Sequence, residues 1–215
     1  MALDVEMLTV GPVAENCFLL RRPGADKLLV VDPGEEAERI LAAVQASGAE
    51  VEAILLTHCH FDHIGAVAPV AAATGAPVYC PEIEVPILAD IMRFVPWEGF
   101  GPFESYEADE VVRGGETLEL AGLELDVVFT PGHSPGHVTY GVRGEDAIFS
   151  GDVLFQGSVG RTDLPGADGP TLLASLGTLL ETYPDETVVH PGHMGITTLG
   201  RERATNPFLR ELAGS

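Results

Sequence analysis

Hydrophobic and polar positions divide the first half of the chain into strand-like runs and helical repeats. Alternating or continuous apolar runs predict strands at residues 2–10, 16–21, 27–31, 53–57 and 78–80. Apolar residues at helical spacing predict helices at residues 35–47, 65–74 and 82–91. Gly48 is placed to end the first helix, because glycine readily adopts the left-handed conformation that follows a helix C-terminus. This order of strands and helices indicates a layered α/β fold.

A second half with a similar order begins near residue 107. Its strands are expected at residues 116–120, 123–129, 138–142, 147–150 and 187–189. A glycine-rich loop over residues 153–169 precedes a helix expected at residues 171–182. The chain has 215 residues, a usual length for one large domain, and no linker composition separates the halves. We therefore expect two similar halves within one domain, residues 1–215.

The segment 92–106 differs from its surroundings because it gathers aromatic residues among glycines and prolines. It holds 5 of the 14 aromatic residues of the chain: Phe94, Trp97, Phe100, Phe103 and Tyr106. One interpretation is an apolar wall or lid over a functional site, or a subunit contact. The other is a small apolar cluster that packs under a long loop. The sequence favours neither interpretation and specifies no oligomeric state.

Net charge and hydropathy narrow the classes of partner. The formal net charge is −22, with Lys27 as the only lysine, so the surface repels the phosphate backbone of nucleic acids. No apolar stretch reaches the about 18 residues of a membrane span. The sequence thus predicts neither a nucleic-acid partner nor membrane insertion, and a small molecule is the expected substrate.

The 3 cysteines are too few and too scattered for a disulfide framework. The first ten residues contain Asp4 and Glu6 but no basic residue, so they lack the start of a secretory signal. Both observations favour a cytoplasmic location. Cys59 lies between two histidines, but alternation along an extended segment points it away from them. A packed thiol is therefore preferred over a thiolate ligand.

Histidines gather in three short segments marked by glycine or proline. All 7 histidines fall in them: His58, His60 and His63; His133 and His137; His190 and His193. A carboxylate, Asp152, ends an apolar strand-like run between the last two segments. Loops at strand ends are where layered α/β enzymes carry their functional residues.

The first of these segments, Thr57-His58-Cys59-His60-Phe61-Asp62-His63, places four metal-binding side chains within six residues. Imidazole and carboxylate are ligands that zinc and related metals accept at neutral pH. His58 and His60 face the same way on an extended segment, and Asp62 and His63 follow on the turn that leaves it. The pattern indicates a metal site with room for a second metal position beside the first.

With these residues in this order, the chain resembles the metallo-β-lactamase superfamily over essentially its whole length. Within it, the chain is similar to the glyoxalase II-like hydrolases (hydroxyacylglutathione hydrolases), and more closely to their short, single-domain bacterial members. The supporting motifs are Thr130-Pro131-Gly132-His133, Gly151-Asp152-Val153-Leu154-Phe155, Gly160-Arg161-Thr162-Asp163 and Pro191-Gly192-His193 with Thr197, Thr198, Arg201, Glu202 and Asn206-Pro207-Phe208.

The resemblance implies an αββα sandwich with a dinuclear site. One metal would be held by His58, His60 and His133. The other would be held by Asp62, His63 and His193, with Asp152 as the bridge. Asp62 and Asp152 would be the catalytic carboxylates, and the cofactor would be two divalent metal ions, zinc or alternatively iron or mixed zinc and iron. His137 and His190 would support the ligands or the core, and Arg161 and Asp163 would order the loop beneath the site.

The implied activity is metal-dependent hydrolysis of small hydroxyacyl thioesters, S-lactoylglutathione or a related thiol ester. The alternatives are a mononuclear iron persulfide dioxygenase, a lactonase of the same fold and a metal-bound interaction module without turnover. The chain departs from full-length glyoxalase II proteins at three points. It lacks their C-terminal helical region that contacts glutathione, it reads Gly157-Ser158-Val159-Gly160 before Arg161 where they have Gly-Cys-Gly, and Met194 stands where glycine is common. The first two changes leave the carrier thiol open.

Overall fold

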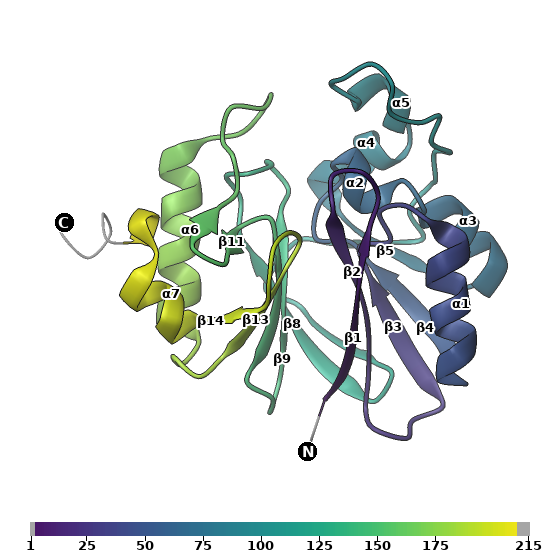
Figure 1. Cartoon of the computed structure of the whole chain (residues 1–215), viewed down its shortest axis with the longest axis horizontal. Coiled ribbons are helices and arrows are strands. Elements are labelled where there is room, and N and C mark those ends of the chain that lie inside the picture. The colour runs from purple at the N-terminus through teal and green to yellow at the C-terminus, as the bar shows by residue number, and fades with distance from the viewer. Residues whose placement is uncertain (1–2, 210–215) are drawn as a thin grey trace.

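Two six-stranded sheets pack face to face, and helices cover the outer face of each (Figure 1). The computed structural model describes residues 3–209. The first sheet has the order β1 (Asp4–Val10), β2 (Glu15–Arg21), β3 (Lys27–Val31), β4 (Glu50–Leu55), β5 (Val78–Pro81) and β6 (Glu110–Val112). The second has the order β14 (Thr197–Thr198), β13 (Val188–Pro191), β10 (Ala147–Gly151), β9 (Val138–Val142), β8 (Leu123–Phe129) and β7 (Thr117–Leu120). A small hairpin joins β11 (Leu154–Phe155) to β12 (Ser158–Val159).

The helices divide between the two outer faces. On the side of the first sheet lie α1 (Ala37–Ser47), α2 (Phe61–Ile64), α3 (Val67–Thr74), the 3-10 turn η1 (Glu82–Glu84), α4 (Val85–Leu88) and α5 (Ile91–Phe94). On the side of the second sheet lie α6 (Gly169–Thr182) and α7 (Leu199–Thr205). None of the helices in the described residues is long and apolar enough to cross a membrane.

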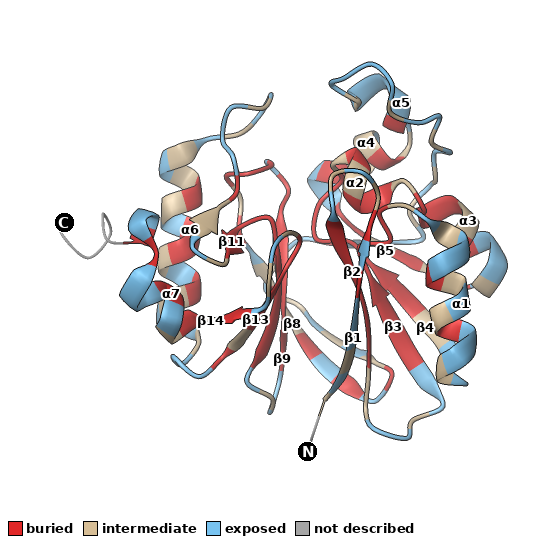
Figure 2. Ribbon diagram, viewed as in Figure 1, coloured by how far each residue is buried: buried red, intermediate tan, exposed pale blue. Residues whose placement is uncertain are grey.

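Three apolar layers hold the sandwich together, and alternation along the strands assigns each side chain to a layer. In β2, Phe18 and Leu20 point into the layer between the sheets, whereas Cys17 and Leu19 point toward the helices. The second sheet contributes Leu125 and Tyr140 to the same central layer. Because the central strands are covered on both faces, their sequences are continuously apolar rather than alternating, and Figure 2 shows them buried.

The expected αββα sandwich with two similar halves is confirmed. Gly48 ends α1 in the left-handed conformation, with φ of 69°, as its position in the sequence predicts. The strand expected at residues 53–57 instead spans Glu50–Leu55, and the helix expected at 65–74 starts at Val67. Residue 2 of the expected first strand lies outside the described residues.

Three further features differ from the expectation. The helix expected at residues 82–91 is broken into η1, α4 and α5. Pro86 lies in the first turn of α4 and has no N–H to bond back toward η1, and Asp90 leaves the helical conformation before α5, with φ of −150° and ψ of 63°. The loop expected over residues 153–169 contains the β11–β12 hairpin. The short strands β6 and β14 were not predicted, since two or three residues carry too little pattern.

Candidate metal centre

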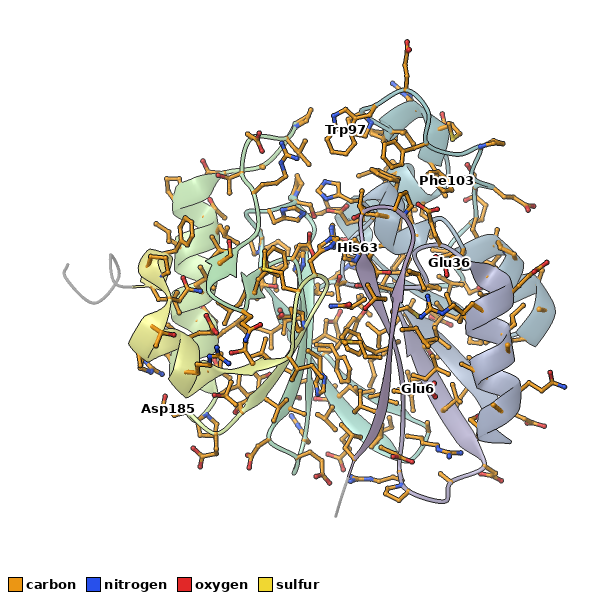
Figure 3. The ribbon with its side chains drawn as sticks, in the orientation of Figure 1. Glu6, Glu36, His63, Trp97, Phe103 and Asp185 are labelled. Carbon is orange, nitrogen blue, oxygen red and sulfur yellow. The ribbon has the colours of Figure 1, made fainter. Side chains whose placement is uncertain are left out.

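The candidate ligands follow the strands of both sheets at one edge of the sandwich. His58 and His60 lie in the loop after β4, and Asp62 and His63 lie in α2, which follows at once. His133 lies between β8 and β9. Asp152 directly follows β10, and His193 lies two residues after β13; the two strands are parallel neighbours. Figure 3 shows His63 between the two halves, so the site is formed by both.

His58, His60 and His133 form one convergent group. Nε2 of His58 lies 3.1 Å from Nδ1 of His60. The same Nδ1 lies 2.8 Å from Nε2 of His133. Three ring nitrogens aimed at one point can accept a single metal ion, and all three atoms lie within 4.8 Å of one another.

Asp62, His63 and His193 form a second group beside the first. Oδ2 of Asp62 lies 3.2 Å from Nε2 of His193 and 3.9 Å from Nε2 of His63. Asp152 lies between the groups, with its carboxylate oxygens 3.3 Å from His63, 3.4 Å from His133 and 3.5 Å from His193. The structure thus brings together all seven residues that the sequence predicts as ligands.

Two buried polar atoms at the centre of this cluster have no hydrogen-bond partner in the described residues. They are Nε2 of His63 and Oδ1 of Asp152. Leaving such atoms unsatisfied costs roughly 1–3 kcal/mol each, so native proteins rarely do so. A coordinated cation would satisfy both, and the donor set of imidazoles and carboxylates fits zinc or iron.

In His63, His133 and His193, the protein holds the ring nitrogen that points away from the ligand cluster. Nδ1 of His63 donates to the buried carboxylate of Asp32 at 3.0 Å. Nδ1 of His133 donates to the carbonyl of Arg161 at 2.9 Å, and Nδ1 of His193 to that of Ala14 at 3.2 Å. Because Nδ1 donates in each of these bonds, Nε2 is the nitrogen left to coordinate a metal.

Burial and mutual repulsion keep several of these imidazoles neutral. Burial lowers the pKa of His58 well below its usual value, and the neighbouring His63 adds to this. Burial, and then the adjacent His133, lower the pKa of His60 to about 4. The pKa of His63 moves upward instead, because Asp152 and Asp32 outweigh the effect of its burial. Neutral His58 and His60 can bind a cation near pH 7 without first releasing a proton.

The two remaining histidines have different surroundings. Nε2 of His137 accepts the backbone N–H of Asp152 at 3.0 Å, and its Nδ1 donates to Thr130 at 3.0 Å, so His137 holds the strand end that carries Asp152. His190 instead lies in the core, stacked on Phe149 with ring centroids 4.8 Å apart. The expectation that both support the ligands or the core agrees with these contacts.

Buried carboxylates near the site that the sequence did not indicate include Asp32 and Glu84. Asp32 accepts hydrogen bonds from the N–H and hydroxyl of Thr57, at 2.7 and 2.6 Å, besides that of His63. Glu84, in η1, accepts three hydrogen bonds from the loops that carry His58, His60 and His133. Asp32 ends an apolar strand, as Asp152 does, and that similarity could have identified it. No sequence signal of this kind marks Glu84.

Cys59 lies outside the ligand groups found in the described residues. It is fully buried, and its sulfur lies 3.5 Å from that of Cys80. This agrees with the preference for a packed thiol. The reason differs from the one expected, because residues 56–60 form an irregular loop rather than a strand.

A cavity of about 540 Å³ opens onto the candidate ligands. Asp62, Asp152 and His193 line its floor, and Phe94, Trp97 and Phe155 are among the apolar side chains of its walls. Most of the exposed lining is apolar. The cavity can therefore take a small molecule with an apolar portion and present its polar centre to the ligand cluster.

The aromatic segment 92–106 both lines the cavity and packs against the core, so each of its two interpretations describes part of it. Phe94 and Trp97 line the cavity, and Trp97 lies above His63 in Figure 3. Phe100, Phe103 and Tyr106 pack instead against the helix-side core. The Arg161 guanidinium lies 5.7 Å from the centre of the Trp97 ring, so the loop carrying Arg161 meets the aromatic wall across the cavity. Arg161 also pairs with Asp163.

Met194 follows the last candidate ligand in the left-handed conformation, with φ of 68°. Glycine adopts this conformation without the steric conflict that a Cβ introduces, which explains why glycine is common there in the family that the sequence resembles. Asn16 stabilises the turn by donating to the carbonyl of Met194 at 2.9 Å. The Met194 side chain is 54% exposed and lines the cavity.

Comparison with known proteins places the chain in a family. Residues 10–193 match the model of the metallo-beta-lactamase superfamily. A probable metallo-hydrolase, YqgX, of Bacillus subtilis is 41% identical over 207 residues, which cover 94% of this chain and 95% of the relative. The hydroxyacylglutathione hydrolase GloC of Haemophilus influenzae is 32% identical over 213 residues, which cover 96% and 98%.

Solved structures agree with these matches. The BLEG-1 B3 metallo-beta-lactamase is 38% identical, with a TM-score of 0.90 over 96% of this chain and 99% of that one. TTHA1623 in a di-iron-bound form is 42% identical, with a TM-score of 0.74 over 95% and 100%. The chain belongs to the metallo-beta-lactamase superfamily. It is a metallo-hydrolase of that superfamily, whose fold binds two metal ions.

Proposed function

We propose that the protein hydrolyses small hydroxyacyl thioesters, S-lactoylglutathione or a related thiol ester. The observation that carries the proposal is the ligand cluster with two metal positions at the floor of a largely apolar cavity. The similarity to GloC, which is named a hydroxyacylglutathione hydrolase, supports the choice of substrate class. We further propose that residues 1–215 form one domain, because both halves supply residues to one site, and that the protein acts in the cytoplasm.

We propose two metal positions with the ligands that the sequence predicts. His58, His60 and His133 hold one ion; Asp62, His63 and His193 hold the other; Asp152 bridges them. Zinc is the proposed metal, with iron or mixed zinc and iron as alternatives, since the donor set suits both. When bound, the two ions supply hydroxide near neutral pH and polarise the thioester carbonyl.

The protein groups position the reactants around that centre. Asp62, at 3.2 Å from His193, is placed both to ligate and to orient the attacking water through its second oxygen. Asp152 is held in place by His137 through its backbone N–H. The aromatic wall formed by Phe94 and Trp97 receives the apolar portion of the substrate. The leaving thiolate needs little protonation because the pKa of a thiol is moderate.

Hydrolysis of β-lactams is a second candidate, favoured by the similarity to the BLEG-1 B3 metallo-beta-lactamase. It uses the same proposed centre and an amide in place of a thioester. The two candidates differ in the shape of the substrate, which the cavity walls select, rather than in the ligands. A direct comparison of substrates therefore separates them.

The test combines metal analysis with a substrate panel. Protein purified without chelator should carry about two ions per chain and should cleave lactoyl thioesters faster than a lactone or a chromogenic cephalosporin. One iron per chain with oxygen uptake on a persulfide would replace the proposal with the dioxygenase. A fastest reaction with the lactone or the cephalosporin would replace it with a lactonase or a β-lactamase. Two bound ions with no turnover of any substrate would favour an interaction module.

A further inference from the structure

Glu84 is a buried carboxylate that joins the two loops of the first metal position. It is fully buried at the end of η1. Its Oε2 accepts the backbone N–H of Cys59 at 3.2 Å. Its Oε1 accepts the hydroxyl of Ser134 and the N–H of Gly136, each at 2.7 Å. These partners lie 25, 50 and 52 residues away along the chain.

Two of the three donors adjoin candidate ligands, and the third, Gly136, lies in the same loop as His133. Cys59 lies between His58 and His60, and Ser134 follows His133. We propose that Glu84 is a positioning residue that sets the affinity of the His58–His60–His133 position for its metal. It does so by fixing the distance between the loop after β4 and the loop between β8 and β9. This inference rests on the ligand set proposed above.

The Glu84 carboxylate is the shared acceptor of hydrogen bonds from both loops. Two of its three donors are backbone N–H groups, which no side-chain substitution other than proline removes. An apolar side chain there would leave these buried donors without an acceptor, which destabilises a folded protein, so the carboxylate holds both loops in place. The close packing is also specific, because a Cβ on Gly136 would lie 2.7 Å from Cγ and Oε1 of Glu84. Gly136 therefore leaves the room that lets this carboxylate approach the second loop.

The effect should be selective for one metal position. The second position is held by other contacts, since Asp32 anchors His63 and the carbonyl of Ala14 anchors His193. Changes to groups that orient metal ligands typically weaken affinity about 10–100-fold. We expect metal affinity to fall by this much at the His58–His60–His133 position, and by less than about threefold at the other position.

The substitution Glu84→Gln tests this, because its amide nitrogen cannot accept from a backbone N–H. It is introduced into two background variants, each of which lacks a ligand of one metal position and so keeps only the other position. In His193→Ala, zinc binds only the first position; in His133→Ala, only the second. Zinc affinity is measured by competition with a chromophoric chelator. Glu84→Gln should weaken zinc binding about 10–100-fold in His193→Ala and less than about threefold in His133→Ala.

Glu202→Gln is the matched control. Glu202 is also fully buried and also accepts three hydrogen bonds, from the N–H of Gly157, the hydroxyl of Thr197 and the amide of Asn206. None of these residues adjoins a proposed ligand. Glu202→Gln should lower the melting temperature of the metal-free protein about as much as Glu84→Gln does, while leaving zinc affinity within about threefold in both backgrounds.

Equal zinc losses in the two backgrounds, or equal losses from Glu84→Gln and Glu202→Gln, would overturn the proposal. If Glu84→Gln does not fold, Ser134→Ala removes one of its donors and should give a smaller loss with the same dependence on background. Two zinc ions still bound by His133→Ala or His193→Ala would overturn the ligand assignment, and with it this role of Glu84. A single remaining ion with no selective effect of Glu84→Gln would overturn the role of Glu84 alone.

Discussion

The protein should become less stable in mild acid, because unfolding lets the buried His190 take up a proton. Replacing His190 with leucine should remove this effect. The imidazole is only 7% exposed, and its Nδ1 has no hydrogen-bond partner in the described residues. It stacks on Phe149 and meets the edge of Phe18. Burial in these apolar surroundings lowers the pKa of His190 to about 4. Leucine fills a similar volume but carries no ionisable group.

The sign follows from proton linkage. The unfolded chain protonates His190 near its ordinary pKa of about 6.5, whereas the folded protein resists protonation until the pH approaches 4. The stability associated with the neutral ring is therefore fully present above pH 6.5. It is lost as the pH falls toward 4 and changes no further below that. The loss amounts to about 2 kcal/mol at pH 5 and roughly 3 kcal/mol at the limit.

The assay is urea unfolding of both proteins, stripped of metal by a chelator, at pH 7.5 and pH 5. The other buried histidines titrate in both proteins, so their contributions cancel in the difference. The free energy of unfolding of the unsubstituted protein should fall by about 2 kcal/mol more than that of His190→Leu. Parallel changes in the two proteins would refute the reasoning, because they would mean that His190 titrates alike in the folded and unfolded chains.

Three further outcomes are expected. Asp152→Ala should reduce bound metal from about two ions per chain to one or fewer, while His137→Ala should weaken affinity only about 10–100-fold; similar metal loss in elemental analysis would mean that the bridge is misassigned. Met194→Gly should raise the free energy of unfolding by up to about 1 kcal/mol by relieving a left-handed conformation, and an unchanged urea midpoint would contradict this. Trp97→Ala should raise KM for lactoyl thioesters several-fold with little change in kcat, since Trp97 lines the cavity away from the ligands; a fall in kcat alone would point to a role in the chemical step.

The ligand set could be predicted because each of its members follows a strand. An apolar run before His58 or Asp152 marks where a strand ends, and residues at such ends meet at one edge of a layered fold. The resemblance to a known superfamily then ordered these residues into two metal positions. The layers could be predicted for the same reason, since the strands and longer helices have clear periodicity.

The supporting residues could not be predicted because their partners are distant along the chain. Glu84 contacts loops 25 and 50 residues away, and nothing near Glu84 signals that its side chain points inward. Within the range 82–91, helical spacing gave the wrong prediction, since Pro86 begins a new helical segment and Asp90 is not helical. Short strands such as β6 depend on pairing with a neighbour rather than on their own residues.

Besides the bridge Asp152, each proposed metal position takes two ligands from the first half of the chain and one from the second. His58 and His60 join His133, and Asp62 and His63 join His193, so a bound ion ties one sheet to the other. The turn at residues 113–116, between β6 and β7, is the connection between the sheets. A chain cut at this turn should yield two fragments that reassociate more tightly with zinc than without it. Zinc would then act as a cofactor for assembling the sandwich as well as for chemistry.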